Sequence, residues 1–426
     1  MEEFVHIGRR QVWGGEVPLM LSRRDRRRHL YIIGQTATGK STLMRNLVAQ
    51  DIAAGAGCAL IDPHGDLTLE VLDCIPGTRI DDTIVIDPSD SDHPVGFNPF
   101  YRVSRDERAL VATNITATFK HIWRDSWGPR LEYILFNTVA ALLDAPDQLR
   151  PTFLAIPRVL VDAAYRDTVV RHIVDPRVRS FFVDEFAHWN DRQLEERLGS
   201  VQNKIGQFLA NPFVRNIISQ WKPSVDLHEV IADKRILVVR LSKGLVGEEP
   251  VNLLGSFIAT GLQQAAMRRA STPEAERHDF HLHIDEFHNF TTDAFASILS
   301  EARKYGLTLT IAHQYIAQLP PSIANAVFGN IGSLISLRVS SVDAERLSAE
   351  IGEFHPRIFT ELEMGEICAR VLQGQASSLT SRGRTLPNLT PQIGKGATVL
   401  SQSRQRYGRS RKQVEQKISY WLAGLK

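Results

Sequence analysis

The sequence lacks the features typical of secreted, disulfide-rich and membrane-spanning chains. Its three cysteines are far apart and form no Cys-x-x-Cys pair, which argues against a disulfide framework or a zinc site. No run approaches the roughly 18 to 20 apolar residues that a membrane span requires, and the N-terminus has no apolar signal core. We therefore expect a reducing, cytoplasmic location, with recruitment to a membrane only through a partner.

The sequence also lacks an excess of charge of either sign. Lys and Arg number 50 and Asp and Glu 48, so the net charge is +2 and a histone-like polycation is excluded. Binding to nucleic acid would have to use local patches, for which basic clusters at 23–28 and 404–412 are candidates. A solvated charged face explains each cluster equally well, because few aromatic residues lie among the basic ones.

Short apolar runs alternate with helical segments, and this pattern is typical of an α/β fold with a mainly parallel sheet. A hairpin around Gly14-Gly15 comes first. The expected strands are 4–7, 17–21, 30–33, 58–62, 84–86, 235–241, 280–284, 307–312, 334–339 and 368–372.

The pattern changes between 106 and 233, where apolar residues recur at helical spacing and strand-like alternation is weak. The expected helices there are 109–119, 131–143, 191–209 and 214–220. A chain of 426 residues is too long to fold around one small hydrophobic core, so we expect an α/β domain with a large insertion. Residues 1–105 are expected to form the hairpin and the first part of the α/β domain, and residues 106–233 the helical insertion. Residues 234–403 are expected to form the second part of the α/β domain, and residues 404–426 a basic amphipathic helix.

One motif in the first segment predicts nucleotide binding. It has the form GxxxxGK[ST], in which backbone amides at a helix N-terminus face phosphates. Lys40 is expected to reach the β- and γ-phosphates, and the Ser41 hydroxyl to ligate Mg²⁺. The expected ATP-binding residues are Gly34, Gln35, Thr36, Ala37, Thr38, Gly39, Lys40, Ser41 and Thr42. An apolar strand precedes the motif and a helix follows it, which is the required context.

A second motif, an acidic pair, follows the strand at 280–284. Asp285 is expected near Mg²⁺, and Glu286 is expected to orient or deprotonate the attacking water. The alternative is that both are solvated carboxylates at a strand end.

Gln314 lies just after the next expected strand, 307–312. A right-handed strand–helix–strand unit would place this side chain beside the γ-phosphate as a sensor, whereas the alternative is an ordinary polar loop residue. Arg303 lies at the end of the helix between these two strands. It is either an arginine finger for a neighbouring subunit's ATP or a cation stabilised by the helix C-terminus.

With these motifs, the chain resembles the HerA/FtsK superfamily of ring-shaped DNA-pumping ATPases, and within it the TraG/TraD-type conjugative coupling proteins and their soluble relatives. The segments that carry the resemblance are 31–34, 39–42, 61–67, 96–99, 127–132, 241–244, 284–287 and 312–314. The Asp-Pro-His-Gly segment and the Asp-Glu and His-Gln pairs are its more specific parts.

The resemblance implies a RecA-like motor domain that assembles as a hexamer, with DNA in a central channel and ATP at subunit interfaces. Such motors place a trans-acting arginine where Arg303 falls. The resemblance also implies a relaxase, a nuclease or a secretion-system component as a partner, and recruitment to the inner membrane through it. Membrane-bound coupling proteins carry N-terminal transmembrane helices that this sequence does not show, which leaves a role in conjugation open.

The segment from Asp62 to Gly65 allows two interpretations. His64 follows a strand at the carboxyl edge of the sheet, where ligands gather in α/β folds, and could contact phosphate or DNA. Alternatively, the segment simply forms the turn that closes the strand, which is the interpretation we favour for Pro63 and Gly65.

The sequence thus predicts an ATP-driven DNA translocase. Two alternatives remain: a secretion-type ATPase that moves protein, and an ATP-switched module that recruits a DNA-processing partner through the helical insertion.

Overall fold

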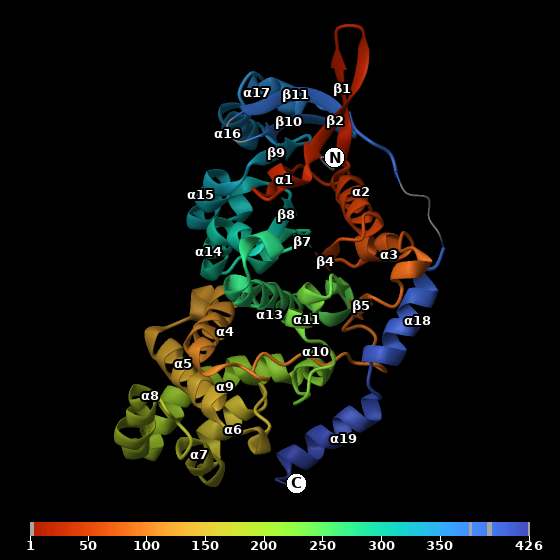
Figure 1. Cartoon of the computed structure of the whole chain (residues 1–426). Coiled ribbons are helices and arrows are strands. Elements are labelled where there is room, and N and C mark those ends of the chain that lie inside the picture. The colour runs from red at the N-terminus through yellow and green to blue at the C-terminus, as the bar shows by residue number, and fades with distance from the viewer. Residues whose placement is uncertain (1–3, 375–376, 390–393, 425–426) are drawn as a thin grey trace. The chain divides into compact units, whose positions relative to one another are not determined.

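The structure is a computed structural model that describes residues 4–374, 377–389 and 394–424 (Figure 1). The chain forms two compact units. The sheet unit comprises Met1–Ile86, Leu227–Leu241 and Ala259–Ser403, and the helical unit comprises Asp87–Asp226, Ser242–Ile258 and Arg404–Lys426.

The sheet unit contains an 11-stranded sheet with the order β2-β1-β11-β10-β9-β3-β8-β7-β4-β6-β5. From β9 to β5 all neighbouring strands are parallel, and from β2 to β9 they are antiparallel, which confirms the predicted mainly parallel α/β fold. The strands are β1 (Phe4–Val12), β2 (Gly15–Ser22), β3 (Leu30–Ile33), β4 (Gly57–Asp62), β5 (Thr83–Ile86), β6 (Ile236–Arg240), β7 (Phe280–Ile284), β8 (Leu307–His313), β9 (Ser333–Ser336), β10 (Glu366–Gln373) and β11 (Ser377–Thr385).

Helices cover both faces of the parallel part, which is why its strands are continuous apolar runs rather than alternating ones. Figure 1 shows α2 (Lys40–Ala53) and α3 (Asp66–Leu72) on one side of β4, β7 and β8, and α14 (Asp293–Glu301) and α15 (Pro321–Asn330) on the other. Every residue of β3, β4, β7 and β8 is buried as a result.

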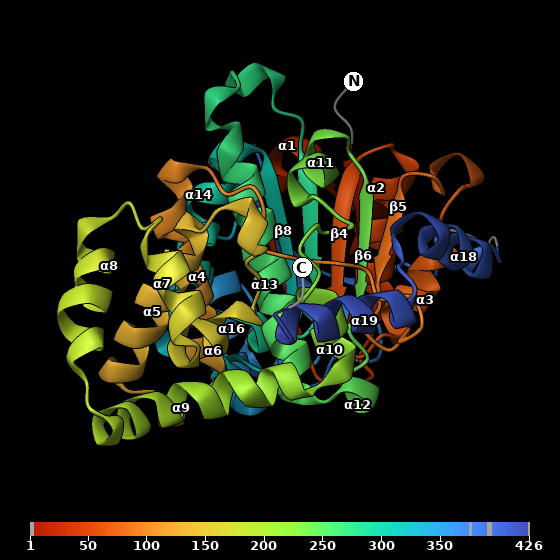
Figure 2. The ribbon, with the colours of Figure 1, turned by 90° about the horizontal axis from the view of Figure 1, so that it is seen from below.

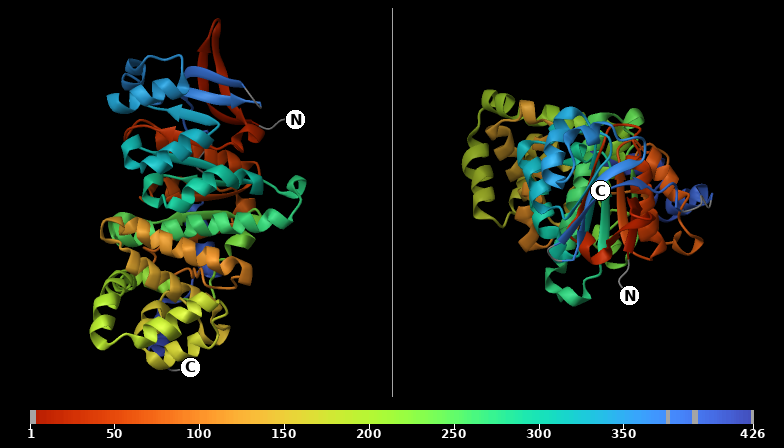
Figure 3. Two further views of the ribbon diagram at one scale, coloured as in Figure 1. Left: turned by 90° about the vertical axis from the view of Figure 1, so that its left-hand side faces the viewer. Right: turned by 90° about the horizontal axis from the view of Figure 1, so that it is seen from above.

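The antiparallel edge includes a strand that the sequence pattern did not predict. β11 is rich in Ser, Thr and Arg and lacks apolar alternation, yet its residues 377–384 pair with β10 and its last three with Gly8–Arg10 of β1. The distal half of the β1–β2 hairpin extends beyond β11 (Figure 3).

A buried ion pair fixes α1 (Arg23–Arg26) and α2 against the sheet. Arg26 and Asp51 are fully buried, and the guanidinium donates two hydrogen bonds to the carboxylate, at 2.6 and 2.8 Å. His283 of β7 donates a third from Nε2, at 2.9 Å. Burial by itself would raise the pKa of Asp51, but Arg26, His281 and His283 together hold it well below its usual range.

The helical unit has an aromatic core. Apart from one isolated β-bridge, its described secondary-structure elements are helices. The rings of Phe119, Phe153, Phe208 and Phe257 contact one another with centroids 4.9–6.2 Å apart. The main helices are α4 (Arg108–Ile122), α5 (Pro129–Asp144), α6 (Ala155–Val161), α7 (Ala163–Val170), α8 (Pro176–Ser180), α9 (Asp191–Ala210), α10 (Pro212–Ile218), α12 (Lys243–Val246) and α19 (Arg411–Leu422).

The unit boundaries differ from the expected insertion at 106–233. The helical unit begins at Asp87, and α11 (Leu227–Ala232) belongs to the sheet unit. The long helix α13 (Glu248–Met267) has no counterpart among the expected elements, and its residues from Ala259 onward belong to the sheet unit.

The prediction of one helix over 404–426 was wrong. α18 (Gly396–Tyr407) ends before Gly408, and α19 begins only at Arg411. The intervening backbone bonds elsewhere: Gly408 forms a β-bridge with Val95, and the Arg409 N–H donates to the Pro94 carbonyl. Figure 2 shows α19 beside α10, where Asn216 donates to Glu415 at 3.3 Å. Within the described ranges, no helix is long and apolar enough to cross a bilayer.

We predict that Asp51→Asn destabilises the protein strongly, because it leaves the Arg26 cation buried without its counter-charge. The expected loss is about 3–5 kcal/mol of unfolding free energy, measured by denaturant titration. Glu361→Gln is the control, because its partner Arg357 is exposed and such pairs contribute little. Equal stability of Asp51→Asn and the wild type would show that the pair is energetically neutral.

The contribution of the pair should also depend on pH. Because the pKa of Asp51 is lower in the folded than in the unfolded chain, its stabilisation is complete above the ordinary carboxyl pKa of about 4 and is lost as the pH falls below it. Denaturant titrations of the wild type should therefore lose stability below about pH 4, and those of Asp51→Asn should lose less.

Candidate functional site

The phosphate-binding loop lies between β3 and α2 and has the geometry that its motif requires. Gly39 has a φ of 111°, which favours glycine, and Ala37 has a φ of 60°. A side chain at Gly34 would meet the Leu337 Cβ at 2.7 Å and the Thr38 Oγ1 at 3.0 Å. The loop therefore needs glycine at both ends of its motif.

Lys40 is the first residue of α2, and its side chain folds back over the loop. Its Nζ donates to the carbonyls of Gly34 at 2.6 Å and Gln35 at 3.1 Å. Burial lowers the pKa of Lys40, while Glu286 and Asp285 act in the opposite direction. The ammonium is thus held at the mouth of the loop with two carboxylates near it.

The acidic pair lies where β7 ends. β7 is parallel to β4, so Asp285 and Glu286 come close to Asp62 at the end of that strand. Burial, together with the charges of Asp62 and Glu286, raises the pKa of Asp285 to about 7. This concentration of buried negative charge favours a cation.

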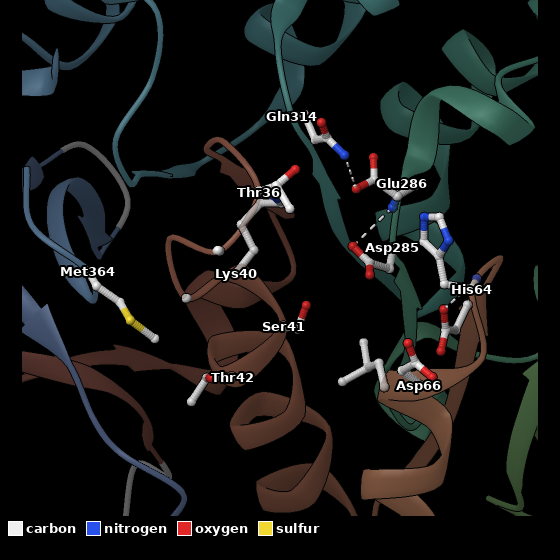
Figure 4. Close-up of a pocket in the computed structure, with 14 residues that line it drawn as sticks. Thr36, Lys40, Ser41, Thr42, His64, Asp66, Asp285, Glu286, Gln314 and Met364 are labelled. Atoms are coloured by element: carbon white, nitrogen blue, oxygen red, sulfur yellow. Dashed lines mark hydrogen bonds between the residues drawn. The ribbon is translucent and has the colours of Figure 1, made fainter.

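Glu286 has an unusual backbone conformation, with φ 44° and ψ 50°. A residue other than glycine in this left-handed region costs roughly 1–2 kcal/mol, and such strain clusters at functional sites. The conformation directs the carboxylate toward Gln314, whose Nε2 donates to Glu286 Oε1 at 3.0 Å (Figure 4).

These groups line a pocket of about 310 Å³ that lies entirely within the sheet unit (Figure 4). Its 14 lining residues are Thr36, Ala37, Gly39, Lys40, Ser41, Thr42, Asp62, His64, Asp66, Leu67, Asp285, Glu286, Gln314 and Met364. The structure thus brings together the predicted loop, acidic pair and Gln314. Gly34, Gln35 and Thr38 belong to the loop but are not among the lining residues.

The structure also adds residues to which the sequence analysis gave no role in the site. Asp66 and Leu67 begin α3, directly after the Asp-Pro-His-Gly segment, so their position could have been found from it. Met364 lies between α17 (Pro356–Thr360) and β10, in a segment that has no motif. The adjacent Gly365 N–H donates to the Thr38 carbonyl at 2.9 Å, which explains why Met364 reaches the loop.

The segment from Asp62 to Gly65 forms a turn, as we favoured for Pro63 and Gly65. The Asp62 carboxylate accepts from the backbone N–H groups of His64 at 2.9 Å and Thr68 at 3.0 Å. Gly65 has a φ of 95° and caps α3. His64 nevertheless lines the pocket, so the turn presents this side chain to the site.

Arg303 lies elsewhere. It is exposed in the short 3₁₀ helix Ala302–Tyr305, which ends at Gly306 with a φ of 70°. It is not among the residues that line the pocket of its own chain.

The oxygen donors of the pocket fit Mg²⁺, which prefers hard ligands and usually keeps water and substrate phosphates in its shell. Ser41 Oγ and the Asp285 carboxylate are the groups that would hold it. Among the described residues, no group of three or more His, Cys, Asp or Glu side chains could bind a metal by itself. The donor set therefore fits a cation that arrives with a nucleotide.

The loop, the acidic end of β7 and Gln314 at the end of β8 define a RecA-type ATPase fold. Residues 5–74 match the family model of the central domain of helicase HerA, and residues 279–392 match the model of the TraM recognition site of TraD and TraG. These matches confirm the resemblance to HerA-type and TraG/TraD-type proteins. No curated protein matches the chain in sequence.

Solved structures show the same fold at low sequence identity. The bacterial conjugative coupling protein TrwBdeltaN70, unbound, has a TM-score of 0.66 and 17% identity, over 92% of this chain and 91% of that chain. TrwB in complex with ADP and Mg²⁺ has a TM-score of 0.62 and 17% identity, over 92% of each chain. VirB4 of Thermoanaerobacter pseudethanolicus has a TM-score of 0.53 and 16% identity, over 91% of this chain and 97% of that chain.

We predict that Lys40→Ala weakens ATP binding by about 10- to 100-fold, as expected for a lost charge-assisted hydrogen bond worth about 1.5–3 kcal/mol. Titration with a fluorescent ATP analogue in the presence of Mg²⁺ measures this. Lys417→Ala, at an exposed position of α19, should bind as the wild type does. Unchanged affinity of Lys40→Ala would identify the loop as a glycine-rich turn without a ligand.

Proposed function

We propose that this protein is an ATP-driven DNA translocase that hydrolyses ATP between subunits of a ring. The observation that carries the proposal is the hydrogen bond from Gln314 to Glu286 across the pocket from Lys40. In this proposal Glu286 is the base, Gln314 the γ-phosphate sensor and Lys40 the phosphate-binding cation, and ATP hydrolysis requires such groups around one cavity.

Each pocket residue has a distinct role in this proposal. The loop amides and Lys40 hold the phosphates, and Ser41 and Asp285 hold Mg²⁺, which neutralises phosphate charge when bound. Glu286 orients the attacking water and accepts its proton. Gln314 contacts both Glu286 and the position expected for the γ-phosphate, so loss of that phosphate on hydrolysis changes what Gln314 can bond to.

A second cation is needed to stabilise the charge that develops on the transferred phosphoryl group. Among the residues that line the described pocket, Lys40 is the sole Lys or Arg. We propose that Arg303 of a neighbouring subunit supplies the second cation, since it is exposed and does not line its own pocket. A site completed in this way makes hydrolysis depend on assembly, and a closed ring, a hexamer by analogy, follows from it.

The proposed cargo and partners rest on the comparisons. TrwB is described as a conjugative coupling protein, which favours DNA in a central channel. The match to a TraM recognition site favours docking of a relaxase, a nuclease or a secretion-system component on residues 279–392. We propose a cytoplasmic motor that such a partner recruits to its place of action, including the inner membrane.

We predict that DNA stimulates ATP hydrolysis severalfold and that Glu286→Gln lowers kcat by about 10²- to 10⁴-fold, because the variant lacks the base. Phosphate release, measured with and without DNA, tests both statements. Glu286→Gln should still bind the ATP analogue, since Lys40 is intact. Equal turnover with and without DNA would contradict the translocase and favour a protein-moving ATPase or a recruitment module.

We further predict that Arg303→Ala subunits inhibit their wild-type neighbours. When the two proteins are mixed and reassembled at increasing ratios, activity should fall more steeply than the wild-type fraction. Lys304→Ala, the adjacent exposed cation, is the matched control and should leave activity unchanged. A linear decrease with the Arg303→Ala fraction would show that this arginine acts only within its own subunit.

A further inference from the structure

Gln318 is not among the lining residues of the pocket and lies at the end of the short 3₁₀ helix Ile316–Gln318 that follows β8. Its Oε1 accepts hydrogen bonds from the backbone N–H groups of Gln314 and Tyr315, both at 3.2 Å. Because backbone N–H groups can only donate, the side-chain atom that faces them is the amide oxygen. The amide nitrogen of Gln318 must therefore point the other way.

That nitrogen lies 3.2 Å from His288 Nε2. An amide nitrogen is a donor only, so His288 Nε2 acts as the acceptor and a neutral ring carries its proton on Nδ1. His288 Nδ1 in turn lies 3.5 Å from Glu286 Oε2. The orientation of one amide thus directs an N–H of His288 toward the carboxylate of the proposed base.

The same amide also fixes the tautomer of a second histidine. His313 Nδ1 lies 3.3 Å from Gln318 Oε1 and must donate to it, which leaves Nε2 to accept from the Tyr31 hydroxyl at 2.5 Å. Burial lowers the pKa of His313 to about 3 and raises that of Tyr31 well above its usual value. A neutral ring and a protonated phenol are the states that this arrangement requires.

We propose that Gln318 is a positioning residue for ATP hydrolysis, which holds Glu286 through two separate contacts. Through the Gln314 backbone it anchors the side chain that donates to Glu286 Oε1 at 3.0 Å. Through His288 it holds an N–H 3.5 Å from Glu286 Oε2, an electrostatic approach rather than a hydrogen bond, at an oxygen that accepts no hydrogen bond within the described part of the chain. The carboxylate of Glu286 is then fixed in the orientation that attack by water needs.

This inference rests on the proposed hydrolysis and predicts a specific kinetic signature. Gln318→Ala and His288→Ala should each lower kcat by about 10- to 100-fold, as misplacement of a catalytic group does, and change the KM for ATP less than twofold. The double variant should be no slower than the slower single variant, because both changes release the same carboxylate. Gln11→Ala, at an exposed position of β1, is the control.

A second set of variants separates positioning from folding. In a Glu286→Gln background, Gln318→Ala should not reduce the residual turnover further, whereas general damage to the fold would. Gln318→Glu keeps the oxygen that the two backbone N–H groups require and removes the donor to His288. It should therefore fold like the wild type and lose as much kcat as His288→Ala, and it carries the test if Gln318→Ala does not fold.

The outcomes distinguish this inference from the proposal on which it rests. Unimpaired kcat in both Gln318 variants, or additive losses with His288→Ala, would overturn the positioning role while Glu286→Gln remains strongly impaired. Absence of ATP hydrolysis by the wild type, or full activity of Glu286→Gln, would instead overturn the proposed function.

Discussion

The site depends on one constraint, the parallel register of β3, β8, β7 and β4. Parallel strands end at the same edge of a sheet, so residues that follow these strands must meet there. Lys40, Gln314, Glu286 and Asp62 come from four separate segments, and this register places all four around one pocket. The apolar core that fixes the register therefore also determines the chemistry.

Negative charge is compensated differently at this edge of the sheet and in the interior beside α2. In the interior, Asp51 of α2 is paired with Arg26 and accepts a hydrogen bond from His283, so its charge is compensated within the protein. At the edge, Asp62, Asp285 and Glu286 share one nearby ammonium, and burial together with the charges of Asp62 and Glu286 raises the pKa of Asp285. A metal cation that arrives with a nucleotide would supply the missing positive charge, which is consistent with a site built to exchange its ligand.

Much of this arrangement could be predicted from the sequence, because local signals were strong. The apolar runs predicted the parallel strands, and the loop motif and Asp285-Glu286 predicted where the pocket lies. β11 could not be predicted, since its pairing depends on neighbours distant in sequence rather than on its own apolar pattern. Met364 and Gln318 were missed for a similar reason, because their importance arises from contacts that no spacing rule encodes. The break at Gly408 likewise depends on bonds to Val95 and Pro94.

The buried pair of Arg26 and Asp51 has a consequence for how such chains can diverge. Either residue alone would leave a full charge in the interior, whereas an apolar pair of similar volume would be tolerated there. The two positions should therefore change together among relatives, and an intermediate with only one of them altered should be rare. In evolution, the two positions should therefore behave as a single unit.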